Sequence, residues 1–228
     1  MSLILSIDTA TPAGSVALHN DGELIGLHQY HIEKSHSTLL HVTIEQLLEN
    51  CSIDKSDISA IAVSGGPGSY TGLRIGVSSA KGLCFGLDVP LIAVNTLEAM
   101  ARQISNTMVS EALLCPMIDA RRQEVYCLIA DRRASVLKET EAVVVDENSF
   151  ENELSQGQVI FFGDGAEKCK SILTHSNALF IDSIIPSAKE IGELAYEKFE
   201  QESFENLAYY EPFYLKEFRI LESKKKYF

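Results

Sequence analysis

The sequence predicts an α/β protein made of two related halves. The first half shows three strand-like segments and then alternates helix with strand, which is the order of a mixed sheet with flanking helices. The second half again starts with strands and ends in helices, and this similarity favours a duplicated unit. The polar segment SNTMVSE separates the halves, which gives predicted lobes of residues 1–106 and 107–228. The predicted strands are 3–8, 15–20, 23–30, 58–64, 91–94, 112–118, 124–130 and 136–145, with another in VIFFGDGA, and the predicted helices are 35–50, 71–87, 96–105, 167–173 and 187–201.

Turn residues and hydrophobic spacing support the elements of the first half. The dipeptide DG at 21–22 lies between two β-like runs and predicts a tight hairpin. In residues 35–50, Leu40, Ile44 and Leu47 recur on one face of a helix. The pattern therefore changes from a period of two to a period of 3.6 along this half.

Composition and charge limit the partners and the compartment. The formal net charge of −13 repels a polyanion, so we expect another chain to hold most of any nucleic acid. No run approaches the roughly 18 apolar residues that a membrane helix requires. The five cysteines contain no C-x-x-C pair and the six histidines no H-x-x-x-H pair, so we expect free thiols and no histidine metal site. We predict a cytoplasmic protein without membrane contact.

A glycine-rich loop joins a predicted strand to a predicted helix within residues 61–76, IAVSGGPGSYTGLRIG. It matches neither the P-loop, nor G-x-G-x-x-G, nor the nucleophile elbow G-x-S-x-G. Two interpretations remain open from the residues alone. The loop either binds an anion at the helix N-terminus, with Arg74 in the first turn, or is a tight turn required by packing.

The helix after this loop carries rows of small residues. Gly72, Gly76 and Ala80 recur every four residues, and such rows permit the close approach of another backbone. The approaching element can belong to the same lobe or to a partner, and spacing does not decide between them. A neighbouring row consists of Ser79, Gly82 and Gly86.

A second candidate site is the turn between the first two predicted strands, in DTATPAGSVAL. Asp8 ends the first strand, and Thr9 and Thr11 follow in the turn. Such a hairpin can place hydroxyls around a phosphate and a carboxylate toward a divalent ion, although these residues are also common in ordinary turns. It therefore predicts possible weak binding of ATP or ADP with Mg. The alternative function that follows is an ATP/Mg-dependent transferase or kinase acting through Asp8 and Thr9.

Several segments together resemble the TsaB family, also called YeaZ, of bacterial tRNA threonylcarbamoyladenosine biosynthesis proteins. The likeness covers about the first hundred residues in ILSIDTATPAGSVAL, SHSTLL, IAVSGGPGSYTGLRIGVSSAKGL and VNTLEAMA, with looser matches in FFGDGAEK and YYEPFYLKEF. The resemblance implies an actin-like ATPase fold of two related lobes. It also implies a non-catalytic scaffold subunit that dimerises with TsaD, a catalytic paralogue, to modify tRNA.

The resemblance further implies which residues bind partners. TsaD holds its metal with an H-x-x-x-H pair, and the corresponding positions are Thr96 and Met100, which cannot replace metal-bound imidazoles. We therefore expect no catalysis by this chain alone, a TsaE-like ATPase in the assembly, tRNA held mainly through partners, and a homodimer of the isolated protein. The family's partner surface is formed by two helices of the first lobe, so the expected interface consists of Leu39, Val42, Gly72, Arg74, Gly76, Ser79 and Ala80.

Overall fold

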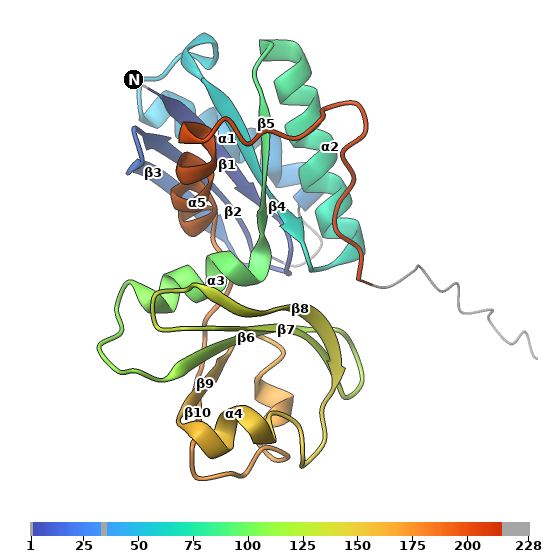
Figure 1. Cartoon of the computed structure of the whole chain (residues 1–228). Helices are drawn as coiled ribbons and strands as arrows, with labels where there is room; N and C mark the ends of the chain where they lie inside the picture. Colours follow the sequence, from blue (N-terminus) through green and yellow to red (C-terminus); the bar gives the residue numbers. More distant parts are fainter. Residues whose placement is uncertain (1, 33–35, 216–228) are drawn as a thin grey trace, which may run out of the picture.

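The protein consists of two lobes, each built on a five-stranded mixed sheet (Figure 1). The structure, a computed structural model, describes residues 2–32 and 36–215. The elements of the first part of the chain are β1 (Leu3–Asp8), β2 (Gly14–Asn20), β3 (Glu23–Tyr30), α1 (His36–Asn50), η1 (Lys55–Asp57), β4 (Ala60–Gly66), α2 (Tyr70–Leu87), β5 (Leu91–Asn95) and α3 (Thr96–Ser105). Those of the second part are β6 (Leu113–Asp119), β7 (Glu124–Ala130), β8 (Val136–Val144), α4 (Glu151–Gln156), β9 (Val159–Phe162), η2 (Glu167–Cys169), β10 (Ala178–Ile181) and α5 (Ala188–Glu200).

The two sheets share one topology. The first has the order β3-β2-β1-β4-β5, and the second has the order β10-β9-β6-β7-β8, which is the same order read from the other edge. In each sheet an antiparallel meander of three strands continues into two parallel strands. The predicted α/β duplication with two mixed sheets is therefore confirmed.

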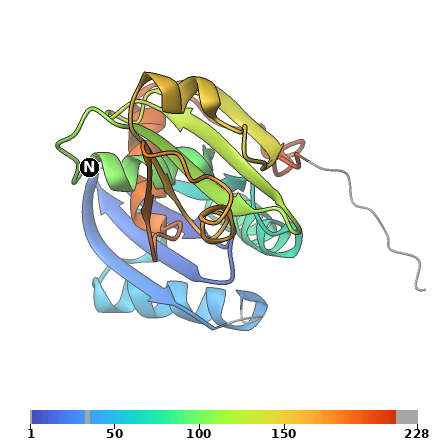
Figure 2. The same ribbon diagram turned by 90° about the horizontal axis from the view of Figure 1, so that it is seen from below.

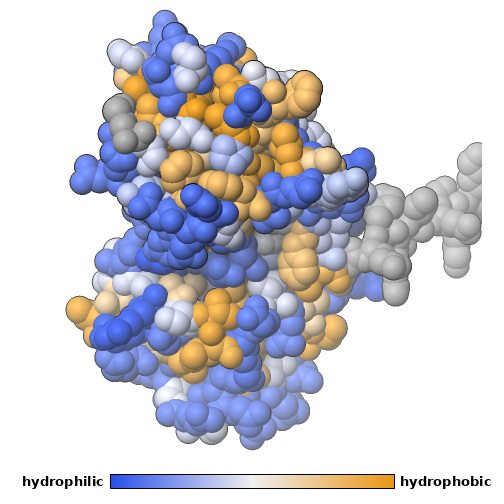
Figure 3. Space-filling model, turned by 45° about the horizontal axis from the view of Figure 1, so that its top comes forward, coloured by the Kyte–Doolittle hydropathy of each residue, from blue (hydrophilic) through white to orange (hydrophobic). Residues whose placement is uncertain are grey.

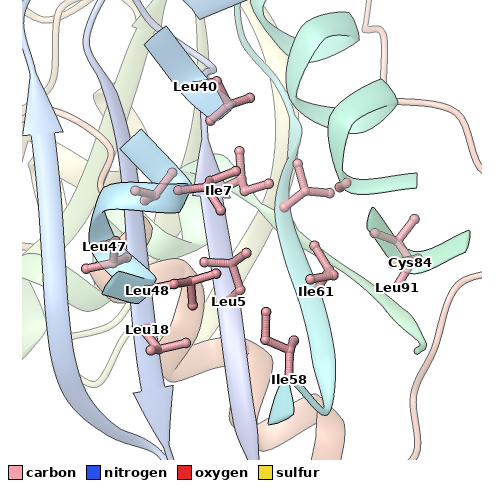
Figure 4. Packing of buried hydrophobic residues seen from close by; sticks show 14 of the residues in the cluster. Leu5, Ile7, Leu18, Leu40, Leu47, Leu48, Ile58, Ile61, Cys84 and Leu91 are labelled. Carbon is pink, nitrogen blue, oxygen red and sulfur yellow. The ribbon is translucent and has the colours of Figure 1, made fainter. Parts of the chain in front are cut away.

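Helices cover both faces of the first sheet. Alternate side chains of a strand point to opposite faces, so Leu5 and Ile7 of β1 pack against Leu40 and Leu47 of α1 (Figure 4). Helix α2 lies beside α1 on this face. Its N-cap is Ser69, whose hydroxyl accepts a hydrogen bond from the Gly72 N–H at 3.4 Å.

The opposite face of the first sheet is covered by α5, although this helix follows the second sheet in sequence. Ile191 and Ala195 pack against Ala60 and Ala62, whose small side chains let the helix approach β4 closely. The expected range of 107–228 for the second lobe thus includes a helix that packs on the first lobe. Packing of α5 on the first lobe is favourable because it removes the apolar face of the first sheet from water.

A segment of residues 203–215 follows α5, crosses the first lobe and runs along the outer side of α2 (Figure 1). Glu205 forms an isolated antiparallel β-bridge with Leu91. The Phe213 N–H donates to the Gly65 carbonyl at 2.7 Å, and Lys81 Nζ donates to the Tyr210 carbonyl at 3.0 Å. We call these residues the C-terminal strap. The strap fixes the end of the described chain beside the glycine-rich loop.

Helix α3 lies between the two sheets and joins the lobes (Figures 1 and 2). Leu97, Met100 and Ile104 pack against residues of the second sheet, among them Leu114 and Phe162. Across the described residues, no helix is long and apolar enough to cross a membrane.

Three short elements of the second lobe differ from the prediction. The predicted helix over residues 167–173 is one 3-10 turn, Glu167–Cys169. The strand β10 and the helix α4 were not predicted. Elements of only four to six residues contain too few periodic positions to be recognised from sequence.

Candidate partner-binding and phosphate-binding sites

The small residues Gly72, Gly76 and Ala80 face the interior of their own lobe. All three are buried. A Cβ on Gly72 would overlap the carbonyl oxygen of Thr9, and a Cβ on Gly76 would overlap the Thr9 hydroxyl. That hydroxyl donates to the Gly72 carbonyl at 2.8 Å, which fixes α2 against the end of β1. All three therefore face residues of their own lobe in this conformation, and their expected contact with a partner stays a prediction.

The neighbouring row of α2 faces outward instead. Apart from the backbone of α2 itself, no atom of the described residues lies within 4 Å of a Cβ built on Gly82 or Gly86. Beside them the Phe85 side chain is 84% exposed. Sequence reasoning missed Phe85, although its position between the two glycines of the second row is a usable signal. The outer side of α2 thus combines a bare backbone with one exposed aromatic ring.

A second accessible surface lies where α1 adjoins α2. Val42 is 49% exposed and Leu39 is half-buried beside it. His41 Nε2 lies 3.2 Å from the Ser79 hydroxyl of α2, and Arg74 is exposed. The expected interface residues Leu39, Val42, Arg74 and Ser79 therefore lie on two adjacent helices with accessible surface. In Figure 3, hydrophobic residues gather over part of the first lobe.

An open groove of about 490 Å³ lies between the N-terminal halves of α1 and α2. Its lining is mainly apolar in area, with Arg74 as the one arginine among the lining residues. The residues that line it include His36, His41, Tyr70, Arg74, Ile75 and Ser79.

The possible phosphate-binding hairpin is filled by the protein's own backbone. Asp8 and Thr9 have no exposed surface, and Thr11 is 4% exposed. The Ser69 N–H donates to the Ala10 carbonyl at 2.7 Å, so the glycine-rich loop lies on the turn where a phosphate would have to bind. The structure brings Asp8, Thr9 and Thr11 together but offers none of them to a ligand in this conformation.

Burial also changes the electrostatics of this turn. Asp8 Oδ1 accepts the Ala10 N–H at 3.1 Å, whereas the buried Oδ2 has no hydrogen-bond partner in the part of the chain that the structure describes. Burial raises the pKa of Asp8, and hydrogen bonds from Ser64 and Ala10 offset only part of that effect. Asp8 therefore lies in a buried environment that disfavours its charged form in this conformation. Within the described part of the chain, no cluster of three or more His, Cys, Asp or Glu side chains is arranged to hold a metal.

Comparison with known proteins places the chain in a family. A family model described as TsaD, tRNA N6-adenosine threonylcarbamoyltransferase, matches residues 26–222. The tRNA threonylcarbamoyladenosine biosynthesis protein TsaB of Escherichia coli is 32% identical over 219 residues, which cover 93% of this chain and 94% of that protein. The chain belongs to the TsaB family. The TsaB protein of Bacillus subtilis is 38% identical over 145 residues, which cover 64% of this chain and 61% of that protein.

Solved structures agree with this assignment to the TsaB family. YeaZ from Pseudomonas aeruginosa superimposes with a TM-score of 0.81 at 26% identity, covering 94% of this chain and 100% of that chain. The activator of 2-hydroxyisocaproyl-CoA dehydratase from Clostridium difficile, solved with bound ADPNP, has a TM-score of 0.51 at 12% identity over 90% of this chain and 98% of that chain. At this identity the second likeness concerns the fold alone. The expected actin-like ATPase fold is confirmed.

The positions compared with the metal ligands of TsaD lie at the junction of the lobes. Thr96 and Met100 are both buried on α3, and Met100 belongs to an apolar cluster with residues of the second sheet. The methyl group of Met100 would lie 2.6 Å from a Cβ on Gly163. In this member of the TsaB family, Met100 packs in an apolar cluster at the position that the resemblance compares with a metal-binding histidine.

Proposed function

We propose that this protein is a non-catalytic scaffold subunit of the machinery that makes threonylcarbamoyladenosine in tRNA. It binds a TsaD-like catalytic paralogue through the outer face of α1 and α2. The observation that carries this proposal is the exposed row of α2, where Phe85 stands between the bare backbones of Gly82 and Gly86. An aromatic ring surrounded by accessible backbone is a suitable anchor for a partner helix.

The remaining features of the assembly follow from this subunit role. We propose that the same face mediates a homodimer of the isolated protein, because a surface that fits a paralogue is close in shape to one that fits a copy. A TsaE-like ATPase joins the complex, and most of the tRNA is held by the partners. The place of action is the cytoplasm. An interface of ordinary size buries about 800 Å² on each partner, which is more than one helix provides and requires both α1 and α2.

The alternative is an ATP/Mg-dependent transferase or kinase acting through Asp8 and Thr9. We favour the scaffold because these two side chains have no exposed surface and the glycine-rich loop lies on their turn. Isothermal titration of the isolated protein with ATP and Mg distinguishes the two functions. Tight binding that is lost in Asp8→Asn, together with turnover, would support the alternative.

Co-elution with the TsaD-like subunit tests the proposed interface. Phe85→Asp places a charge on the exposed row of α2 and should weaken the complex at least tenfold, since loss of an interface anchor costs about 2 kcal/mol or more. Val109→Asp is the matched control, because Val109 is 97% exposed in the loop between the lobes. Both variants should melt like the wild type, because neither side chain packs in the core. Normal co-elution of the Phe85 variant would refute the interface.

Reconstitution tests the function itself. Purified partners should modify tRNA at a much higher rate with this protein than without it, and this protein alone should produce no modified tRNA. An equal rate in both reactions would refute the scaffold role.

A further inference from the structure

The C-terminal strap lies on the outer side of the glycine-rich loop. The Phe213 N–H donates to the Gly65 carbonyl at 2.7 Å, and a Cβ on Gly66 would overlap the Phe213 carbonyl oxygen. A Cβ on Gly65 would overlap the Tyr210 hydroxyl. Both glycines are buried, with strap atoms directly against them. The strap therefore shields this part of the loop from water.

The glycine-rich loop in turn lies on the turn between β1 and β2. The Ser69 N–H donates to the Ala10 carbonyl at 2.7 Å, and a Cβ on Gly68 would overlap the same carbonyl oxygen. Beside it, the Thr9 hydroxyl donates to the Gly72 carbonyl at 2.8 Å. The strap, the loop and the turn thus form a stack in which each layer rests on the backbone of the next.

The bottom of this stack holds polar groups that are closed off from solvent. Asp8 and Thr9 have no exposed surface, and Thr11 is 4% exposed. Among the described residues, nothing donates a hydrogen bond to Asp8 Oδ2. A buried carboxylate oxygen without a partner is unfavourable, so the closed stack carries a cost that opening to water would relieve.

The strap is the least firmly held layer of the stack. Every one of residues 203–215 is exposed or half-buried. Hydrogen bonds hold the strap at Glu205 and Phe213, near its two ends, and at Lys81, which donates to two strap carbonyls. Its apolar anchors in the first core are Leu207 and Tyr210. Segments with so few buried contacts open locally at a much lower free energy than a core strand does.

Tyr210 connects the strap to both the core and the loop. Its ring packs against the apolar core of the first lobe, and its hydroxyl lies against Gly65. The neighbouring Tyr209 side chain is 83% exposed. Removal of the Tyr210 ring therefore loosens the strap at the point where it meets the loop, and the adjacent tyrosine offers a matched comparison.

We propose that the C-terminal strap is a latch that controls access to the turn at Asp8. While the strap is docked through Tyr210, the glycine-rich loop rests on the turn and closes off its carboxylate and hydroxyls. When the strap leaves, the loop can lift from Ala10 and expose Asp8, Thr9 and Thr11 to solvent. The latch goes beyond the scaffold function, because it concerns the strap and the turn and not a partner surface.

Amide hydrogen exchange of the isolated full-length protein, followed residue by residue by NMR, tests the latch. The reporting amides are those of Phe213 in the strap, Ser69 in the loop and Ala10 in the turn, which all donate hydrogen bonds within the stack. In Tyr210→Ala all three should exchange at least about tenfold faster than in the wild type, because loss of a packed ring shifts a local opening equilibrium by that factor or more.

Three further variants separate the latch from a general loss of stability. Tyr210→Phe keeps the ring and should exchange like the wild type. Tyr209→Ala removes an exposed ring and should leave the three amides unchanged. Lys81→Met keeps the side-chain stem but removes the donor to the strap carbonyls, so it should accelerate the same amides by a smaller factor. This variant also provides the test if Tyr210→Ala does not fold.

Three results would overturn the latch. Faster exchange at Phe213 alone, with Ser69 and Ala10 unchanged, would mean that the strap leaves without opening the loop. Unchanged exchange at all three amides would mean that Tyr210 does not hold the strap. Equal acceleration throughout the first sheet would indicate global unfolding in place of a local opening. The measurement needs no partner, so its failure is distinguishable from failure of the co-elution test at Phe85.

Discussion

Replacing Gly72 by alanine tests how α2 is fixed to its own lobe. A Cβ at this position would overlap the Thr9 carbonyl oxygen, which is backbone and cannot rotate away. Helix α2 would have to move outward, and the hydrogen bond from the Thr9 hydroxyl to the Gly72 carbonyl, 2.8 Å in the wild type, would lengthen. The change therefore combines overpacking with the loss of a buried hydrogen bond.

The expected size follows from these two effects. Overpacking of a dense core costs about 1–3 kcal/mol, and a buried hydrogen bond contributes about 1 kcal/mol. The higher helix propensity of alanine returns about 1 kcal/mol. Gly72→Ala should thus lower the free energy of unfolding by about 1–3 kcal/mol. In a chain of this length, that corresponds to a melting temperature lower by roughly 2–12 °C.

Gly82→Ala is the control within the same helix. Outside the backbone of α2, its Cβ would meet no atom of residues 2–32 and 36–215 within 4 Å, so only the gain in helix propensity remains. We expect an increase of about 0.5–1 kcal/mol and a slightly higher melting temperature. Thermal melts followed by circular dichroism, with urea titrations as a second measurement, should therefore show changes of opposite sign for the two variants.

A Gly72→Ala variant as stable as the wild type would refute this account of the packing. It would mean that Thr9 does not fill the space beside α2, and the row of Gly72, Gly76 and Ala80 would be available to a partner. If the account is right, larger side chains at Gly72 and Gly76 disturb the fold and cannot be used to test partner binding.

The other two predictions concern buried ionisable groups. Burial lowers the pKa of His19 from 6.5 to about 4. As the pH falls through this window, the unfolded state takes up a proton and the folded state does not. The free energy of unfolding therefore decreases by at most about 1.4 kcal/mol per pH unit. In His19→Leu this contribution is absent, so the melting temperature should fall less between pH 7 and pH 5 than it does in the wild type. A variant with the same pH profile as the wild type would contradict the lowered pKa of His19. Burial raises the pKa of Asp8, so its ionised form destabilises the folded state at neutral pH and this cost disappears in acid. Asp8→Asn should melt higher than the wild type at neutral pH and support normal tRNA modification, whereas lost modification would favour the nucleotide hypothesis.

Local patterns in the sequence were sufficient to predict most elements of the fold. The DG dipeptide before Glu23 and the spacing of Leu40, Ile44 and Leu47 depend on near neighbours in the chain, so they could be recognised without a structure. The duplication was visible as a repeated order of strands and helices. The short β10 and α4 were missed because a few residues contain too little periodic signal.

The choice between the two rows of small residues on α2 depended on tertiary structure. By spacing alone, the row of Gly72 and the row of Gly82 equally permit another backbone to approach α2 closely. Only the folded protein places Thr9 against the first row and leaves the second exposed. The burial of Asp8 under the glycine-rich loop has the same origin, since the loop and the hairpin are about sixty residues apart in the chain.

The sequence by itself determined where strands and helices form, because those signals are local, and it determined the likeness to the TsaB family through residues that lie close together in the chain. Tertiary structure decided which faces remain accessible. It placed α5 on the first sheet, brought Tyr214 of the strap beside Tyr70, and added Tyr126 from the other lobe. The physical reason is that exposure depends on which distant segments compete to cover each apolar or polar face, and this competition is settled only when the whole chain packs.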